Sequence, residues 1–215
     1  MKPVSQQPRW YTSLFIVSVF AFVSVVSVGV NADNRSQDTT YYFLRHAEFD
    51  KQNPDKPLNP KGQERAQALV AHFEGMPITH IYATHTDRTL DTVKPLSEHW
   101  GISISQVPGQ GQSIKGKTVT NRSKGKVAIK PMLKALKAVD GGSQVVVSAN
   151  SGNLFPIMAG LGVPLVGEEA CRNEPANCLP CKNKKCFPKK AFNNIWQVTL
   201  AADGQVRLQR SRYGD

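Results

Sequence analysis

Acidic residues are scarce in this sequence. Asp and Glu number 16 against 27 Lys and Arg, and the formal net charge is +11. Lys2 and Arg9 contribute two of these charges to the first 32 residues, which leaves +9 on the remainder. This imbalance predicts anionic partners, although charge alone does not choose among nucleic acid, anionic lipid and phosphorylated small molecules.

Other features are also missing. No stretch interleaves aromatic and basic residues, and no recognised nucleic-acid-binding motif occurs, so specific nucleic-acid binding ranks last among the anionic partners. Wholesale disorder is excluded because 40% of the residues are hydrophobic and only 20% are charged. A chain of 215 residues with this composition predicts one folded domain and one active cleft.

The N-terminus has the layout of an export signal. The segment from Ser13 to Val30 carries no charge, follows Lys2 and Arg9, and ends at Val30-Asn31-Ala32, which suits cleavage after Ala32. The apolar run is longer than in most cleaved signals, so residues 1–32 are predicted as a signal peptide or, if retained, a membrane anchor. Either alternative exports the domain, which is expected to be periplasmic or secreted and to contact a membrane only through a retained anchor.

All four cysteines lie close together, in an insert predicted over residues 168–190 of a domain spanning 40–215. They are Cys171, Cys178, Cys181 and Cys186. In an exported protein such a set predicts two disulfides, with three pairings left open. The alternative is a four-thiolate zinc site, because Cys178 and Cys181 have ligand spacing.

Strand and helix patterns alternate along the rest of the chain. Strands are predicted at 41–44, 78–83 and 144–148, each followed by a helix, at 60–73, 88–96 and 154–161. A further helix is predicted at 128–139, a loop at 107–125, and a closing hairpin at 194–200 and 205–210. This order predicts a three-layer α/β/α sandwich with a mostly parallel sheet and a C-terminal hairpin, which binds ligands at the carboxyl ends of its strands.

Basic residues stand at those strand ends. Arg45 and His46 follow the first predicted strand, and Arg88 opens the helix after the second. Two guanidinium groups beside an imidazole favour phosphoryl chemistry, since arginine matches phosphate oxygens with paired donors and a helix N-terminus attracts anions. His46 is the candidate nucleophile, which would divide one displacement into two steps.

Several spaced segments resemble the histidine phosphatase superfamily, which includes the phosphoglycerate mutases. They are Tyr42-Phe43-Leu44-Arg45-His46-Ala47-Glu48, then Leu58 to Ala66, then Ile81-Tyr82-Ala83-Thr84 with Arg88 and Thr92. The resemblance implies a phosphohistidine formed on His46, with Arg45 and Arg88 binding the phosphoryl group and no metal or cofactor. Thr92 matches a family threonine and is expected to serve helix packing.

The sequence departs from this pattern where the family places a second histidine. The aligned residue is Asn150, and the chain has no histidine after His99. Asn150 can donate a hydrogen bond to a phosphoryl oxygen but carries no charge. His85, in the turn before Arg88, is a further candidate for substrate binding, with an exposed turn histidine as the alternative. No general acid is identified, and Glu48 is expected to be a salt-bridged or capping neighbour.

Two functions follow. The first is an exported phosphohydrolase that removes a phosphoryl group from a small phosphate monoester or a phosphorylated biomolecule. The second is a catalytically weakened or inactive relative that binds phosphorylated or other anionic ligands. The intact Arg45, His46 and Arg88 favour the enzyme, whereas Asn150 favours the binding module.

Overall fold

The structure is a computed structural model that describes residues 37–167, 180–181 and 191–214. The chain divides into two units, Met1–Asn31 and Ala32–Asp215, and all described residues belong to the second. The predicted signal or anchor segment therefore lies outside the described residues. Across the described ranges, no helix combines the length and the hydropathy needed to cross a bilayer.

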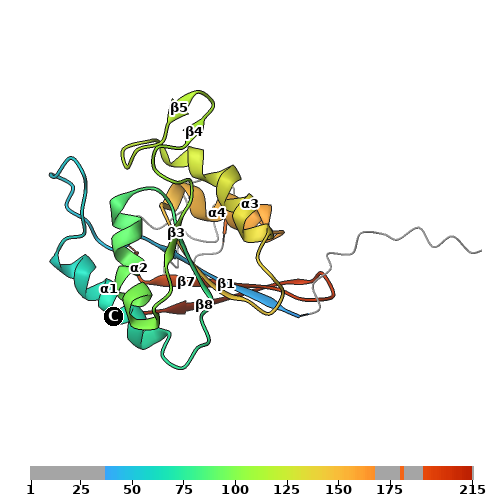
Figure 1. The fold of residues 1–215 in the computed structure, drawn as a ribbon. Helices are drawn as coiled ribbons and strands as arrows, with labels where there is room; N and C mark the ends of the chain where they lie inside the picture. Colours follow the sequence, from blue (N-terminus) through green and yellow to red (C-terminus); the bar gives the residue numbers. More distant parts are fainter. Residues whose placement is uncertain (1–36, 168–179, 182–190, 215) are drawn as a thin grey trace, which may run out of the picture. The chain divides into compact units, whose positions relative to one another are not determined.

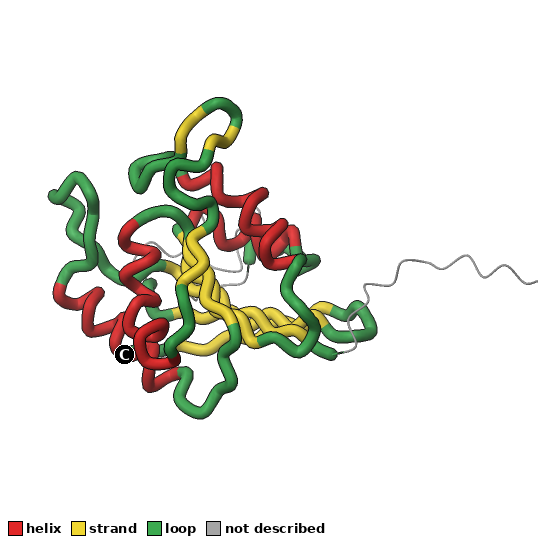
Figure 2. Tube along the Cα trace, in the orientation of Figure 1, coloured by secondary structure: helices red, strands yellow, loops and turns green. Residues whose placement is uncertain are grey.

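A six-stranded sheet forms the centre of the second unit, in the order β3-β2-β6-β1-β7-β8 (Figures 1 and 2). Its strands are β1 (Thr39–Arg45), β2 (His80–Ala83), β3 (Ile104–Gln106), β6 (Gln144–Ala149), β7 (Asn194–Leu200) and β8 (Val206–Arg212). Strands β3, β2, β6 and β1 pair in parallel, while β7 runs antiparallel to both β1 and β8. The mostly parallel sheet with a C-terminal hairpin is therefore confirmed.

Helices cover both faces of this sheet (Figure 1). They are α1 (Pro60–His72), α2 (Asp87–Trp100), α3 (Ile129–Lys137) and α4 (Ser151–Gly160). Side chains alternate along β1, so Tyr41 and Phe43 pack with residues of α3 and α4, whereas Tyr42 and Leu44 pack with residues of α1 and α2. This alternation produces the predicted three layers.

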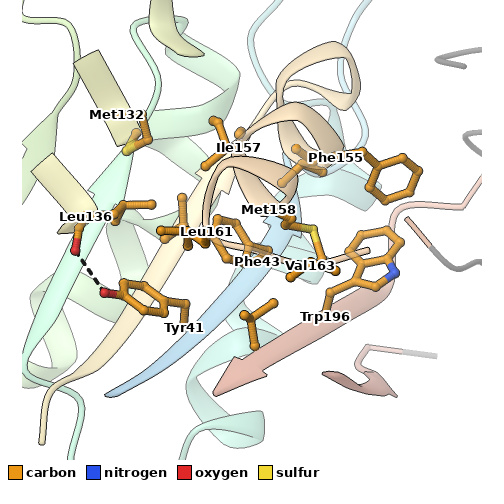
Figure 3. Close-up of a cluster of buried hydrophobic side chains, with 14 of the residues drawn as sticks. Tyr41, Phe43, Met132, Leu136, Phe155, Ile157, Met158, Leu161, Val163 and Trp196 are labelled. Atoms are coloured by element: carbon orange, nitrogen blue, oxygen red, sulfur yellow. Dashed lines mark hydrogen bonds between the residues drawn. The ribbon is translucent and has the colours of Figure 1, made fainter. Parts of the chain in front are cut away.

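Mostly apolar side chains fill the core between the sheet and the pair α3 and α4, where Tyr41 and Trp196 each carry one polar group (Figure 3). Tyr41 donates from its hydroxyl to the Leu136 carbonyl oxygen at 2.8 Å, so the buried hydroxyl is satisfied at the end of α3. Phe155 of α4 meets Trp196 of β7 edge to face, with ring centroids 5.4 Å apart. These contacts fix α4, and with it the residues at its N-terminus, against the sheet.

Two features of residues 100–128 differ from the sequence expectation. Ile104–Gln106 forms β3, and the predicted loop contains a small hairpin of β4 (Ser113–Ile114) and β5 (Lys117–Thr118). Strands of two or three residues are too short to show an alternating pattern. The hairpin turn uses Lys115 and Gly116, both with positive φ. A 3₁₀ turn, η1 (Gly125–Ala128), then leads into α3.

The start of α1 lies directly against the Arg-His segment. Asn59 caps the helix, accepting a hydrogen bond of 2.9 Å from Gly62 N–H, and Pro60 occupies the first helical position, as predicted. A Cβ atom on Gly62 would lie 1.9 Å from the Glu48 carbonyl oxygen. Only glycine permits this approach, which sets the position of α1 relative to β1.

Three of the four cysteines lie outside the described residues. Cys181 is buried, with 2% of its surface exposed, and it is not a free thiol. It forms a parallel bridge with Val166, whose N–H donates to the Pro180 carbonyl oxygen at 2.9 Å. The choice between two disulfides and a zinc site stays a prediction.

Candidate active site

Three parallel strands end at one edge of the sheet and bring the candidate residues together. Arg45 pairs in register with Ala149, and Ala83 with Ser148. The ladder continues one step further, since His46 N–H donates to the Ala149 carbonyl oxygen at 3.2 Å. The residues after β1, β2 and β6 are therefore neighbours, as the rule for strand ends predicts.

These neighbours line a cleft with a volume of about 390 Å³, a size suited to a small organic phosphate. Four of the five predicted site residues line it: Arg45, His46, Arg88 and Asn150. The other lining residues are Phe49, Lys56, Thr86, Ser123, Gly125, Lys126, Ser151, Gly152 and Asn153. No Asp or Glu is among the described residues that line this cleft.

His46 is buried, and its ring is fixed as one tautomer. Nδ1 lies 2.8 Å from the Ala47 carbonyl oxygen. Because a carbonyl oxygen only accepts, Nδ1 carries the hydrogen and Nε2 keeps its lone pair. Burial, followed by the charge of Arg45, lowers the pKa of His46 to about 3. The imidazole is therefore neutral at neutral pH, the form that a nitrogen nucleophile requires.

Each arginine of the cleft lies against an aromatic ring. The Arg45 guanidinium carbon lies 4.0 Å from the centroid of Phe192, and that of Arg88 lies 5.3 Å from the centroid of Phe49. Burial and the neighbouring Arg88 charge lower the pKa of Arg45 to about 10, so the group remains charged at neutral pH. Two positive charges thus face a buried, neutral imidazole, an arrangement that favours an anion between them.

Asn150 has both ends of its amide engaged. Its Oδ1 accepts a hydrogen bond of 2.5 Å from Nη2 of Arg88, and its Nδ2 donates to Oγ1 of Thr86 at 3.2 Å. A weaker contact of 3.5 Å joins Nδ2 to Oγ1 of Thr84. The side chain therefore orients Arg88 and connects the N-termini of α2 and α4, besides lining the cleft.

His85 does not line the cleft, and it is not an exposed turn residue either. Its side chain is fully buried, and Nε2 lies 2.8 Å from the Ser123 carbonyl oxygen, to which it donates. His85 thereby ties residues 120–125, which contribute Ser123 and Gly125 to the cleft wall, to the turn before α2. The structure assigns it to loop positioning, which differs from both expectations for this residue.

The N-terminus of α4 supplies a donor that the sequence did not indicate. Asn153 is 1% exposed and lines the cleft, and its Nδ2 has no hydrogen-bond partner among the described residues. Unsatisfied buried donors are rare, so this one is a candidate contact for a bound anion. Ser151 and Gly152 open the same helix, whose N-terminus favours negative charge. In the sequence, Asn153 is only a polar residue just before an apolar helix, and nothing there marks it as a donor to the cleft.

Two residues near His46 have structural roles, as expected. Glu48 accepts two hydrogen bonds of 2.8 Å, from Nε and Nη2 of Arg65, so it is a salt-bridged neighbour. Burial raises the pKa of Glu48, but the hydrogen bonds and charge of Arg65 outweigh that effect and leave it lowered. Thr92 accepts from Ala47 N–H at 2.8 Å, which attaches α2 to the Arg-His segment.

The comparisons agree with this geometry. Residues 41–109 match the histidine phosphatase superfamily (branch 1). A putative phosphohistidine phosphatase SixA from Nakamurella multipartitia is similar in structure, with 18% identity, 84% of this chain and 99% of that chain covered, and a TM-score of 0.50. A putative alpha-ribazole-5'-P phosphatase from Escherichia coli has 12% identity, coverage of 81% and 96%, and a TM-score of 0.54.

A phosphoserine phosphatase from Entamoeba histolytica, in complex with 3-phosphoglyceric acid, shows 14% identity, coverage of 82% and 98%, and a TM-score of 0.52. At these identities the likeness concerns the fold. A search of curated protein sequences returned no significant match. The family match covers the segment that carries Arg45, His46 and Arg88. Residues 41–109 are thus similar to the histidine phosphatase superfamily, and the fold of the described residues is similar to the folds of these solved phosphatases.

Proposed function

We propose that the chain is an exported phosphohydrolase that removes a phosphoryl group from a phosphate monoester by way of phospho-His46. The observation that carries the proposal is the state of His46: a buried, neutral imidazole whose Nδ1–H donates to the Ala47 carbonyl oxygen. Nε2 is then the nucleophilic atom. Arg45 and Arg88 line the same cleft and supply charge for the phosphoryl oxygens.

The reaction has two steps. The Nε2 lone pair forms a bond to phosphorus while the bond from phosphorus to the leaving oxygen breaks, and that oxygen keeps the electron pair. Water then attacks the phosphorus of phospho-His46, the N–P bond breaks, and inorganic phosphate leaves with His46 neutral again. In this proposal the leaving oxygen takes its proton from solvent.

The test is turnover of 4-nitrophenyl phosphate by the purified full-length chain. His46→Ala is expected to reduce turnover to background, while the matched control His99→Ala, on the exposed end of α2, is expected to retain it. A protein quenched under alkaline conditions should carry the mass of one phosphoryl group on His46. Turnover that survives His46→Ala would overturn the proposal.

A second function, the binding of phosphorylated ligands without turnover, is favoured by one observation. Asn150 occupies the position at which a charged imidazole would assist the reaction. Its amide is neutral and accepts a hydrogen bond from Arg88, so it adds no charge to the cleft. Removal of a transition-state donor costs roughly 100- to 1,000-fold in rate. Two results together would favour this function. The parent protein would bind phosphate without hydrolysing 4-nitrophenyl phosphate, and Asn150→His would gain turnover.

Export belongs to the same proposal, and it rests on the uncharged run from Ser13 to Val30 between basic residues and Val30-Asn31-Ala32. The expected mature N-terminus is Asp33, with the protein in a periplasmic or secreted fraction. Sequencing of the mature N-terminus tests this, and a protein that keeps Met1 in a membrane fraction would show the retained anchor instead.

A further inference from the structure

A second pocket adjoins the phosphoryl cleft and shares Arg45 and Phe49 with it. Its volume is about 470 Å³, and its other lining residues are Glu48, Lys51, Asn59, Lys61 and Phe192. We call it the side pocket. Since Arg45 and Phe49 line both spaces, a ligand with its phosphoryl group at His46 can extend from the cleft into the side pocket.

The side pocket is positively charged. The Glu48 carboxylate is compensated by Arg65, which donates to both of its oxygens at 2.8 Å. Lys51 and Lys61 add two further positive charges, and Arg45 lines the same pocket. Neither lysine forms an ion pair with another described residue, and both are exposed. The side pocket therefore attracts an anionic group beyond the one held at His46.

Two phenyl rings that line the side pocket also lie beside the His46 ring. Phe49 lies edge to face with the His46 ring, with centroids 5.1 Å apart, and the centroid of Phe192 lies 5.9 Å from that of His46. Both rings also line the side pocket. A planar or apolar unit of a ligand would fit beside them, because aromatic side chains favour such contacts.

The walls of the side pocket are fixed by backbone contacts. Asn59 N–H donates to the Glu48 carbonyl oxygen at 3.1 Å, and Asp50 N–H donates to that of Pro57 at 2.9 Å. Phe49 forms an antiparallel bridge with Leu58 between these bonds. Lys61 is in the first turn of α1, which the close approach of Gly62 to Glu48 holds beside the Arg-His segment. The backbone beside the side pocket thus has a defined position relative to His46.

We propose that the side pocket is an anion subsite for the leaving group. This inference rests on the proposed function and names its substrate class: an organic phosphate whose leaving group carries a second anionic group on a planar or apolar unit. Lys51 and Lys61 bind the second anion, and Phe49 and Phe192 contact the unit that joins the two anions.

The test measures binding, so it does not depend on turnover. Dissociation constants for phenylphosphonate and for 3- and 4-carboxyphenylphosphonate are measured by calorimetry on the full-length chain. All three compounds place a phosphonate at His46, and only the two carboxylated compounds carry a further anion. We expect at least one carboxylated compound to bind about fivefold tighter than phenylphosphonate, as two partly exposed ion pairs contribute. The preference should shrink as salt is added.

The variant Lys51→Gln/Lys61→Gln should lower the preference to about one. The matched control is Lys134→Gln/Lys137→Gln, two exposed lysines on α3 that line neither pocket, and it should keep the full preference. Equal affinities for all three phosphonates in the parent, or a preference that survives in Lys51→Gln/Lys61→Gln, would overturn the subsite.

The two proposals fail separately. A parent that prefers a carboxylated phosphonate but turns over no aryl phosphate supports the anion subsite and contradicts the proposed phosphohydrolase activity. A parent that turns over 4-nitrophenyl phosphate through His46 but binds the three phosphonates equally supports the phosphohydrolase activity and contradicts the anion subsite.

Discussion

Arg88 donates from Nη2 to Oδ1 of Asn150 at 2.5 Å, and this contact joins the helices that follow β2 and β6. Asn150 therefore sets the orientation of Arg88. Asn150 in turn donates to Oγ1 of Thr86, so its amide has a defined direction. Asn150 thus provides an ordered polar contact without a positive charge of its own.

Asn150→Asp tests whether this contact sets the charge of the cleft. The carboxylate would pair with Arg88, reduce the net positive charge, and lose the donor to Thr86. We expect kcat/KM for 4-nitrophenyl phosphate to fall roughly 100-fold, and phenylphosphonate to bind more weakly. Asn53→Asp is the control, because its side-chain oxygen accepts from Asp55 N–H in an exposed loop, and aspartate can do the same. Unchanged binding in Asn150→Asp would contradict the assignment.

The pH dependence of stability should report the buried imidazole. The pKa of His46 is lowered from 6.5 to about 3 in the folded chain, so the unfolded chain binds a proton first as pH falls. Folding stability is therefore highest above pH 6.5 and decreases as pH falls toward 3, by up to about 1.4 kcal/mol per pH unit from this residue.

Urea denaturation at pH 7.5 and pH 5 measures this effect in the parent and in His46→Gln. We expect the parent to lose more stability than the variant over this interval, because glutamine does not titrate. Equal losses in the two proteins would show that the imidazole does not change its protonation on unfolding.

The ion pair of Glu48 and Arg65, next to the Arg-His segment, is predicted to stabilise the fold. The side chains are 15% and 9% exposed, and Arg65 also donates from Nη1 to the Gly214 carbonyl oxygen at 2.8 Å. Arg65→Met leaves a buried, uncompensated carboxylate and should lower the free energy of unfolding by about 3 kcal/mol at pH 7.

The pH dependence of that loss has a defined sign. In the parent, the lowered pKa of Glu48 stabilises the folded chain at pH values above 4.5, the ordinary pKa of this group. This contribution is lost as pH falls through the pKa of Glu48 in the folded chain. In Arg65→Met, burial instead raises the pKa of Glu48, so the loss relative to the parent should be smaller at pH 4 than at pH 7. Adding Glu48→Gln to Arg65→Met should recover part of the stability in chemical denaturation.

Gly62→Ala is expected to move α1 away from the Arg-His segment. The added Cβ would lie 1.9 Å from the Glu48 carbonyl oxygen, a distance that requires the backbone to shift. We expect a loss of about 1–3 kcal/mol in the free energy of unfolding, together with reduced turnover. Gly109→Ala serves as the control, since its Cβ meets no atom within 4 Å and its φ is not positive. Thermal unfolding of both variants measures the difference.

If solvent protonates the leaving oxygen, as proposed, the rate should depend strongly on the leaving group. The departing oxygen then carries its negative charge into solvent. We expect kcat/KM to fall from 4-nitrophenyl phosphate to phenyl phosphate to an alkyl phosphate, by roughly 100-fold or more across the series. Equal rates across the series would reveal a proton donor.

The sequence predicted those site residues whose positions follow from regular structure. Arg45, His46 and Asn150 come directly after buried parallel strands, and Arg88 opens a helix, so the strand-end rule places them together. His85 follows β2 at the same edge, but its neighbour Ser123 belongs to a loop without periodicity, and that tertiary contact keeps the ring out of the cleft.

The site residues that the sequence did not predict lie where tertiary contacts decide the direction in which a side chain points. Phe49 and Lys56 belong to an irregular loop, and Phe192 follows the cysteine-containing insert, so no pattern indicated which way they point. Asn153 lies in the sequence just before the helix predicted at 154–161, and only its burial beside the cleft distinguishes it. The short strands β3, β4 and β5 gave no alternation to detect.

The position of β1 at the centre of the sheet has a consequence for the order in which the chain folds. The strand that carries Arg45 and leads to His46 pairs with β6, about 100 residues later, and with β7, about 155 residues later. During synthesis, β1 can pair with β6 once residue 149 has emerged, but its other edge stays open until residue 200 has emerged. A chain stopped before β7 thus contains every residue of the phosphoryl cleft yet leaves an aromatic strand unpaired on one side, where it invites aggregation.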